Sequence, residues 1–170
     1  IDNQALLSFV ESNPTFFTAI VLDVWEGEPL IHQQLLEKVT IATPHIAGYS
    51  LEGRTRGTEQ VYLALCLFLG VVPKHQLADF LPKNSSVITV DAYSSLWGML
   101  AQVLQTAYPI FEDDRQFRAT MLLAENERSL AFDALRKNYW PRRQFATHQV
   151  RVTACDNEVI SYLQKLDFLV

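Results

Sequence analysis

The sequence has few of the residues and patterns that identify a class of protein directly. Its two cysteines, Cys66 and Cys155, lack the spacing of a zinc site or a disulfide framework, so we expect reduced, intracellular thiols. The longest apolar stretch, residues 61–72, is too short to span a bilayer, and no signal-peptide pattern opens the chain. Lysine and arginine number 14 against 19 acidic residues, and this net charge of -5 argues against a broad nucleic-acid-binding surface. These absences favour a cytoplasmic protein whose partner is a small molecule or another protein.

The chain also lacks G-x-G-x-x-G, the glycine-rich loop with which many proteins hold the phosphates of a dinucleotide. It begins with Ile1 instead of methionine, and Asp2 or Asn3 can cap a helix immediately afterwards. An opening inside a structured element leads us to expect a fragment or a processed product. The 49% of hydrophobic residues are enough to build a packed core.

A strand, a helix and a second strand follow this first helix. Residues 19–24 form a continuous apolar run typical of a strand buried on both faces of a parallel sheet. Residues 31–38 have the pattern of a helix, and residues 39–42 that of a second short strand. The pattern predicts a βαβ unit, and ligands of open α/β sheets bind at the carboxyl ends of such strands.

Polar residues suited to acid/base chemistry follow both predicted strands. Asp23 and Glu28 come after the first strand and His45 after the second. Oxidation of a secondary alcohol needs a base for the hydroxyl proton, and an imidazole oriented by a carboxylate suits this task. Gly48 would allow the backbone to approach a ligand closely. Each residue also has a structural interpretation, in which the histidine is an ordinary loop residue and Asp23 ends a strand.

The combination of these residues resembles the D-2-hydroxyacid dehydrogenase family. Residues 23–29 match Asp-Val-x-x-x-Glu-Pro, and residues 44–48 match Pro-His-Ile-x-Gly. The resemblance implies that His45 is the catalytic acid/base and Glu28 its carboxylate partner. It also implies that the cofactor is NAD, with Asp23 near the nicotinamide and Gly48 against the cofactor. Trp25, between the two carboxylates, is expected to pack and not to recognise a ligand.

The sequence departs from the family in three respects. The glycine loop is absent, and so are the catalytic arginine, which precedes the equivalent of Ile1 in the family, and the substrate-binding half. The resemblance therefore covers nearly the whole chain but only the latter part of an intact enzyme. We expect the isolated chain to be inactive and to bind NAD weakly.

A long helix is predicted over residues 51–69, and its apolar second half leads us to expect deep burial. Where the substrate-binding half is missing, we expect this face to be exposed or to pack on another chain. Arg54 and Arg56 near its start either meet an anionic substrate or pair with Glu52 or Glu59. Residues 45–58, and Tyr49 above all, resemble one branch of the family that acts on a phosphorylated hydroxy acid. The resemblance implies that Tyr49 contacts the substrate.

The remaining residues form a smaller module. Prolines interrupt the pattern, and we predict a catalytic region over 1–72, a linker over 73–85 and a second domain over 86–170. Strands are predicted at 86–90 and 147–152, and helices at 94–108, 114–136 and 158–166. The module resembles the dimerisation domain of the same branch and implies a homodimer, for which the aromatic and arginine residues of 139–145 are suited. The same side chains could instead close the core of the module.

The predicted fold is thus α/β, with the end of a Rossmann-like parallel-sheet nucleotide-binding domain followed by a small α/β dimerisation domain. Two other functions stay open. One is a dimerising or regulatory module without catalysis, which the missing glycine loop favours. The other is a different D-2-hydroxyacid dehydrogenase, acting on phosphoglycerate or glycerate.

Overall fold

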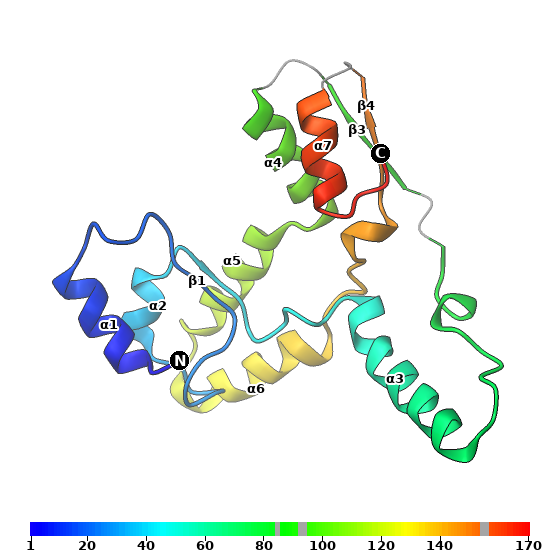
Figure 1. The fold of residues 1–170 in the computed structure, drawn as a ribbon. Helices are drawn as coiled ribbons and strands as arrows, with labels where there is room; N and C mark the ends of the chain where they lie inside the picture. Colours follow the sequence, from blue (N-terminus) through cyan, green and yellow to red (C-terminus); the bar gives the residue numbers. More distant parts are fainter. Residues whose placement is uncertain (84–85, 92–94, 154–156) are drawn as a thin grey trace. The chain divides into compact units, whose positions relative to one another are not determined.

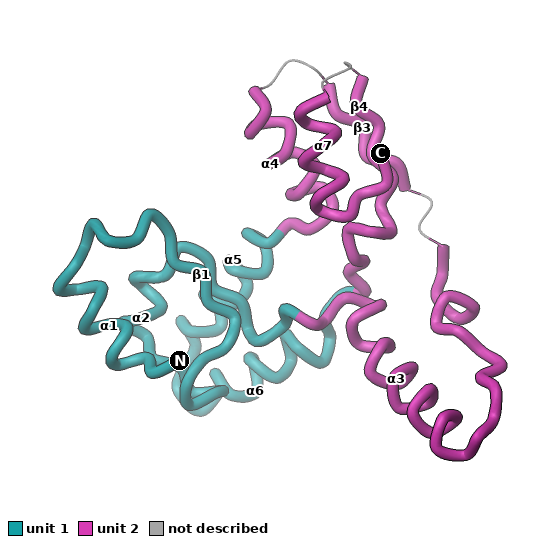
Figure 2. Tube along the Cα trace, viewed as in Figure 1, with its two compact units in different colours: residues 1–47, 110–140 teal, residues 48–109, 141–170 magenta. Residues whose placement is uncertain are grey.

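The computed structural model describes residues 1–83, 86–91, 95–153 and 157–170, which form two compact units (Figure 2). The first unit combines residues 1–47 with 110–140, and the second combines residues 48–109 with 141–170. The chain thus divides at positions other than the expected linker at 73–85, and that domain boundary stays a prediction. Cys155 lies outside the described residues.

The first unit contains the predicted βαβ arrangement. Helix α1 (Asn3–Ser12) is followed by β1 (Val21–Leu22), α2 (Gln33–Lys38) and β2 (Ile41–Ala42) (Figure 1). Strands β1 and β2 are parallel, with Val21 opposite Ile41 and Leu22 opposite Ala42. The Asp2 carboxylate caps α1 by accepting the Ala5 N–H at 2.8 Å, as a helix N-terminus requires. The predicted parallel βαβ arrangement is confirmed, but Val21 is 56% exposed, so the expectation that the first strand is buried on both faces is wrong.

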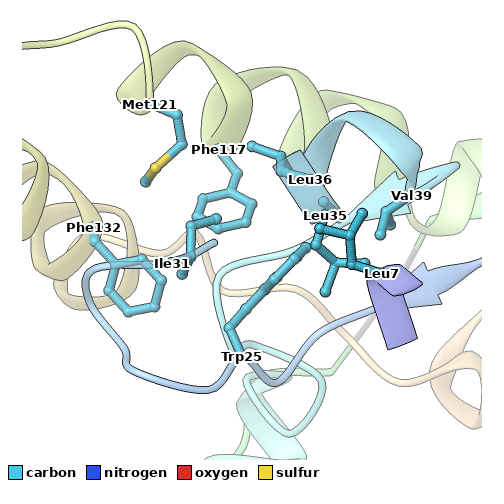
Figure 3. Close-up of a cluster of buried hydrophobic side chains, with 10 residues drawn as sticks. Leu7, Trp25, Ile31, Leu35, Leu36, Val39, Phe117, Met121 and Phe132 are labelled. Carbon is cyan, nitrogen blue, oxygen red and sulfur yellow. The ribbon is translucent and has the colours of Figure 1, made fainter. Parts of the chain in front are cut away.

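Two later helices complete this unit. The single helix predicted over 114–136 is wrong, because the chain forms α5 (Ile110–Thr120) and α6 (Glu125–Lys137) with a turn between them. Helix α5 packs beside β2. The core of the unit collects side chains from α1, α2, α5, α6 and the segment after β1 (Figure 3); its buried members are Leu7, Trp25, Ile31, Leu35, Leu36, Val39, Ala42, Phe117, Met121 and Phe132.

The second unit has its own parallel strands and helices. It contains α3 (Leu51–Leu69), the 3-10 helix η1 (Leu77–Asp79), β3 (Val87–Val90), α4 (Leu96–Ala107), the 3-10 helix η2 (Phe145–Thr147), β4 (Gln149–Val152) and α7 (Asn157–Lys165). Strands β3 and β4 pair in parallel, and α4 packs against both β3 and α7 (Figure 1). Val90, Val103, Val159 and Leu163 are fully buried between them.

Helix α3 spans the predicted residues, and of the two expectations for its apolar face the exposed one is confirmed and deep burial is not. Ser50 caps its start, Gly70 ends it at φ 66°, and only Glu52 and Cys66 of the helix are buried. Leu67 and Phe68 are 83% and 86% exposed, and η1 is the main helical element that packs along α3 in the described part of the second unit. None of the described helices is both long and apolar enough to cross a membrane.

Candidate active site

The predicted histidine and glutamate meet in the first unit. The Nδ1 atom of His45 lies 2.9 Å from Oε2 of Glu28. Oε1 of the same carboxylate accepts the Trp25 N–H at 2.8 Å, which fixes the direction of the other oxygen. Because a carboxylate only accepts, Nδ1 carries the hydrogen and Nε2 is the basic nitrogen of the neutral ring. Nε2 has no hydrogen-bond partner among the described residues, and the His45 side chain is 46% exposed.

Three carboxylates follow β1, and the structure gives each a different partner. Glu26 accepts the Asn3 N–H at 3.0 Å, at the positive N-terminal end of α1. Asp23 accepts hydrogen bonds from the loop that carries His45. Glu28 alone faces the imidazole, so the geometry separates the acid/base partner from two carboxylates with structural contacts.

The histidine loop is fastened to Asp23 at several points. Oδ1 of Asp23 accepts the Thr43 hydroxyl at 2.6 Å and the Ile46 N–H at 2.7 Å, and Oδ2 accepts the Ala47 N–H at 3.0 Å. The Asp23 carbonyl also accepts the His45 N–H at 2.8 Å. His45 has φ 57°, in the left-handed region that costs a residue with a side chain about 1–2 kcal/mol. These hydrogen bonds hold the histidine in that conformation.

Trp25 anchors the segment between the carboxylates in the core. Its ring is buried, its Nε1 donates to the Thr43 carbonyl at 2.9 Å, and it packs 5.7 Å from the Phe117 ring, centre to centre (Figure 3). The expectation that Trp25 packs is confirmed. Gly27 allows the tight path between the carboxylates, because it has φ 78° and a side chain there would lie 3.2 Å from the Leu30 carbonyl oxygen.

A cavity borders the histidine loop, and the sequence had not indicated it. It has a volume of about 490 Å³ and is lined by Pro44 and Ile46 on one side and by residues of α5, α6 and the segment after α6 on the other. Its polar lining includes the buried Asp113, whose Oδ2 accepts the Tyr139 hydroxyl at 2.7 Å. The spacing of apolar residues predicts that α5 and α6 each bury one face, but it does not predict that these faces lie against the His45 loop.

Gly48 and Tyr49 belong to the second unit. A side chain at Gly48 would meet nothing within 4 Å, so the described residues leave open space there. A side chain at Gly53 would lie 2.6 Å from the Gly48 carbonyl oxygen, so Gly53 lets this loop pack on the start of α3. The Arg54 guanidinium lies 5.2 Å from the centre of the Tyr49 ring, a cation–π distance. The sequence had not indicated this role for Gly53.

The segment 142–144 holds the start of α3. The predicted pairing of Arg54 or Arg56 with Glu52 or Glu59 is not among the described contacts. Arg143 Nε donates to Glu52 Oε1 at 2.5 Å, and Gln144 N–H donates to Glu52 Oε2 at 3.0 Å. Burial raises the pKa of Glu52, but these hydrogen bonds and the charge of Arg143 outweigh it and hold the pKa below 4.5. Glu59 accepts the Leu77 N–H at 2.7 Å, so neither glutamate is paired with Arg54 or Arg56 among the described contacts.

Comparison with known proteins supplies the family. Residues 80–166 match the family model described as "Domain of unknown function (DUF3410)". The erythronate-4-phosphate dehydrogenase of Pseudomonas putida (strain W619) is 44% identical over 171 residues, covering 100% of this chain and 44% of the relative. The enzyme of the same name from Psychromonas ingrahamii is 42% identical and covers 96% of the chain and 41% of the relative. The chain spans less than half the length of these relatives. It belongs to the DUF3410 family and is related to the C-terminal portion of erythronate-4-phosphate dehydrogenases.

Proposed function

We propose that this chain supplies the acid/base pair and the C-terminal region of an NAD-dependent erythronate-4-phosphate dehydrogenase. The reaction is the oxidation of 4-phospho-D-erythronate to 3-hydroxy-2-oxo-4-phosphobutanoate, a step in pyridoxal phosphate (vitamin B6) biosynthesis. The observation that carries the proposal is the His45–Glu28 pair, with Nδ1 on the carboxylate and Nε2 open, in a chain related along its length to enzymes of this name.

The histidine performs the proton transfer in this proposal. The Nε2 atom of His45 accepts the proton of the substrate C2 hydroxyl while the hydrogen on C2 leaves with its electron pair, and the C–O bond becomes a carbonyl. The imidazolium that forms is stabilised by Glu28 at 2.9 Å. Acid/base catalysis of this kind contributes about 10²–10⁴-fold to the rate.

The residues of this chain fit the reacting end of a dinucleotide. When bound, NAD supplies the hydride acceptor. Gly48 has open space above its α-carbon, and Asp23 keeps about one of the roughly four acceptor positions of a carboxylate after three are used by the loop. The family resemblance implies that the nicotinamide end lies against Gly48 and near Asp23. We assign no residue of this chain to the phosphates of NAD, because the sequence contains no glycine-rich phosphate-binding loop.

The substrate and the assembly follow from the same resemblance. Tyr49 is proposed to contact the substrate, and the residues after about Ser86 to form a homodimer in the cytoplasm. Trp97 on α4 is 68% exposed, as a side chain of an interface would be in an isolated protomer. The arginines and the tyrosine of 139–145 have internal partners instead. The Tyr139 hydroxyl donates to Asp113, Arg143 pairs with Glu52, and the buried Arg142 guanidinium lies 4.0 Å from the Tyr108 ring centre.

The test uses an enzyme in which this chain replaces the matching portion of the Pseudomonas putida (strain W619) relative. Replacing His45 by alanine should lower turnover of 4-phospho-D-erythronate by about 10² or more, read from NADH absorbance, with little change in NAD affinity. The control is His75→Ala, because His75 is exposed in the second unit. Unchanged turnover in His45→Ala would refute the role of His45.

The same chimaera separates the alternative functions. Preference for 3-phosphoglycerate or glycerate would identify another D-2-hydroxyacid dehydrogenase. A folded chimaera without turnover on any of these substrates would favour the dimerising or regulatory module. The unmodified Pseudomonas enzyme is the positive control for an inactive chimaera and has to be active in the same assay.

A further inference from the structure

The loop that carries His45 is organised around one carboxylate. Three consecutive backbone N–H groups, of His45, Ile46 and Ala47, all donate to Asp23, the first to its carbonyl and the other two to its side chain. Such a run of N–H groups forms a concave anion site when one residue is left-handed, as His45 is at φ 57°. The Asp23 carboxylate occupies this site.

We propose that Asp23 is a positioning residue that sets the direction of the His45 ring towards Glu28. This inference rests on the proposed function, and it gives Asp23 a role other than the nicotinamide contact that the family resemblance implies. The left-handed conformation of His45 is what turns the N–H groups of Ile46 and Ala47 to the same side. Without a negatively charged acceptor for these N–H groups, nothing offsets the cost of the left-handed backbone conformation of His45.

Thr43 provides an independent part of the same arrangement. Its hydroxyl donates to Asp23 Oδ1 at 2.6 Å, while its carbonyl accepts the Trp25 indole N–H at 2.9 Å. The carboxylate, which follows β1, is therefore also held by the first residue after β2, and this residue binds Trp25, which is buried in the core. Ring orientation thus depends on Asp23 and Thr43, although the hydrogen bond of the ring goes to Glu28.

Nuclear magnetic resonance of the 170-residue chain tests this directly. The ¹⁵N shifts of the His45 ring and the low-field Nδ1 proton report the hydrogen bond to Glu28. Asp23→Ala should abolish that signal, and Asp23→Asn, which keeps one acceptor oxygen, should weaken it. Thr43→Val should also weaken it. The matched control is Thr40→Val, because the Thr40 hydroxyl only accepts the Ile20 N–H at the other end of β2.

The chimaeric enzyme separates positioning from cofactor contact. Misplacing a catalytic group by about 1 Å costs about 10²-fold, so we expect kcat of Asp23→Ala to fall by 10- to 100-fold, with KM for NAD changing by less than about threefold. Asp23→Asn should recover part of the loss. A rise in KM for NAD with an unchanged His45 signal would overturn the proposal in favour of a cofactor contact.

Two further outcomes keep this inference distinct from the proposed function. A lost His45 signal with unchanged turnover in both Asp23→Ala and His45→Ala would refute the catalytic role and leave the positioning intact. An intact signal in a folded Asp23→Ala or Asp23→Asn chain would refute the positioning alone. If Asp23→Ala fails to fold, the His45 signal of Thr43→Val is compared with that of Thr40→Val. A signal that is equally strong in both would refute the positioning.

Discussion

Replacing Glu52 by glutamine should loosen the start of α3 by an amount that the structure allows us to estimate. The Glu52 side chain is 8% exposed and that of Arg143 16%, so water screens their interaction poorly. Glutamine keeps the shape of the side chain but removes its charge. One carboxylate oxygen becomes an NH₂ group, which cannot accept the hydrogen bond from either Arg143 or the Gln144 N–H. Breaking a buried pair costs about 3–5 kcal/mol, and a hydrogen bond to a charged group is worth about 1.5–3 kcal/mol. Because Arg143 keeps some access to water, we expect about 2–3 kcal/mol.

Amide hydrogen exchange at Leu51 measures this loss locally. The Leu51 N–H donates to the Arg142 carbonyl at 2.7 Å, next to the altered pair but without touching it. At about 1.4 kcal/mol per factor of ten, its protection should fall by roughly 30- to 150-fold in Glu52→Gln at neutral pH. Protection that falls less than about threefold would refute the claim that this pair holds the start of α3.

The effect of pH on this pair has a defined sign. Because the pKa of Glu52 is lowered in the folded chain, its contribution to stability is fully present above about pH 4.5 and is lost as the pH falls through the folded pKa. The difference between the wild type and Glu52→Gln should therefore shrink below pH 4.5. Glu112→Gln is the control. Hydrogen bonds from Arg115 and Gln116 lower the pKa of Glu112 to about 2, but its side chain is open to water in the first unit, so we expect no measurable loss of protection at Leu51.

Two other predictions concern the second unit. Gly53→Ala places a side chain 2.6 Å from the Gly48 carbonyl oxygen and should cost about 1–3 kcal/mol in urea unfolding, whereas Gly57→Ala, with open space, should stabilise the helix by about 0.5–1 kcal/mol; equal effects would contradict the packing argument. Light scattering should give twice the chain mass of 19.4 kDa, and Trp97→Ser should shift it towards the monomer. Dissociation by Leu67→Ser instead would place the interface on α3, and a monomeric wild type would refute the homodimer.

The sequence predicts elements well where local signals mark both ends. Ser50 and Gly70 enclose α3, and the helix begins and ends as expected. No such signal separates α5 from α6, because the turn contains Met121, Leu122 and Leu123, which favour a helix. The sequence left the burial of α3 open for another reason, since an apolar composition indicates that a helix needs a packing partner but does not identify that partner.

The candidate site was predictable from sequence only as a set of residue types. The motifs select His45 and Glu28, and the structure brings these two together at 2.9 Å. They do not show that Glu26 accepts an N–H of α1 or that the Asp23 carboxylate accepts three hydrogen bonds from the loop. Such assignments depend on the path of the backbone, above all on the left-handed conformation of His45, and residue spacing alone does not determine that path.

Helix α5 connects the later part of the chain to the candidate site. Asp114 accepts the Ala42 N–H at 2.7 Å, and Arg118 donates to the carbonyls of Leu36 at 2.8 Å and Val39 at 2.7 Å. Asp114 thus satisfies an N–H of β2 that does not pair with β1, and Arg118 binds two carbonyls at the end of α2. Thr43, the first residue after β2, then holds Asp23. The position of the His45 loop thus depends on α5, a helix that the sequence had assigned to a separate module.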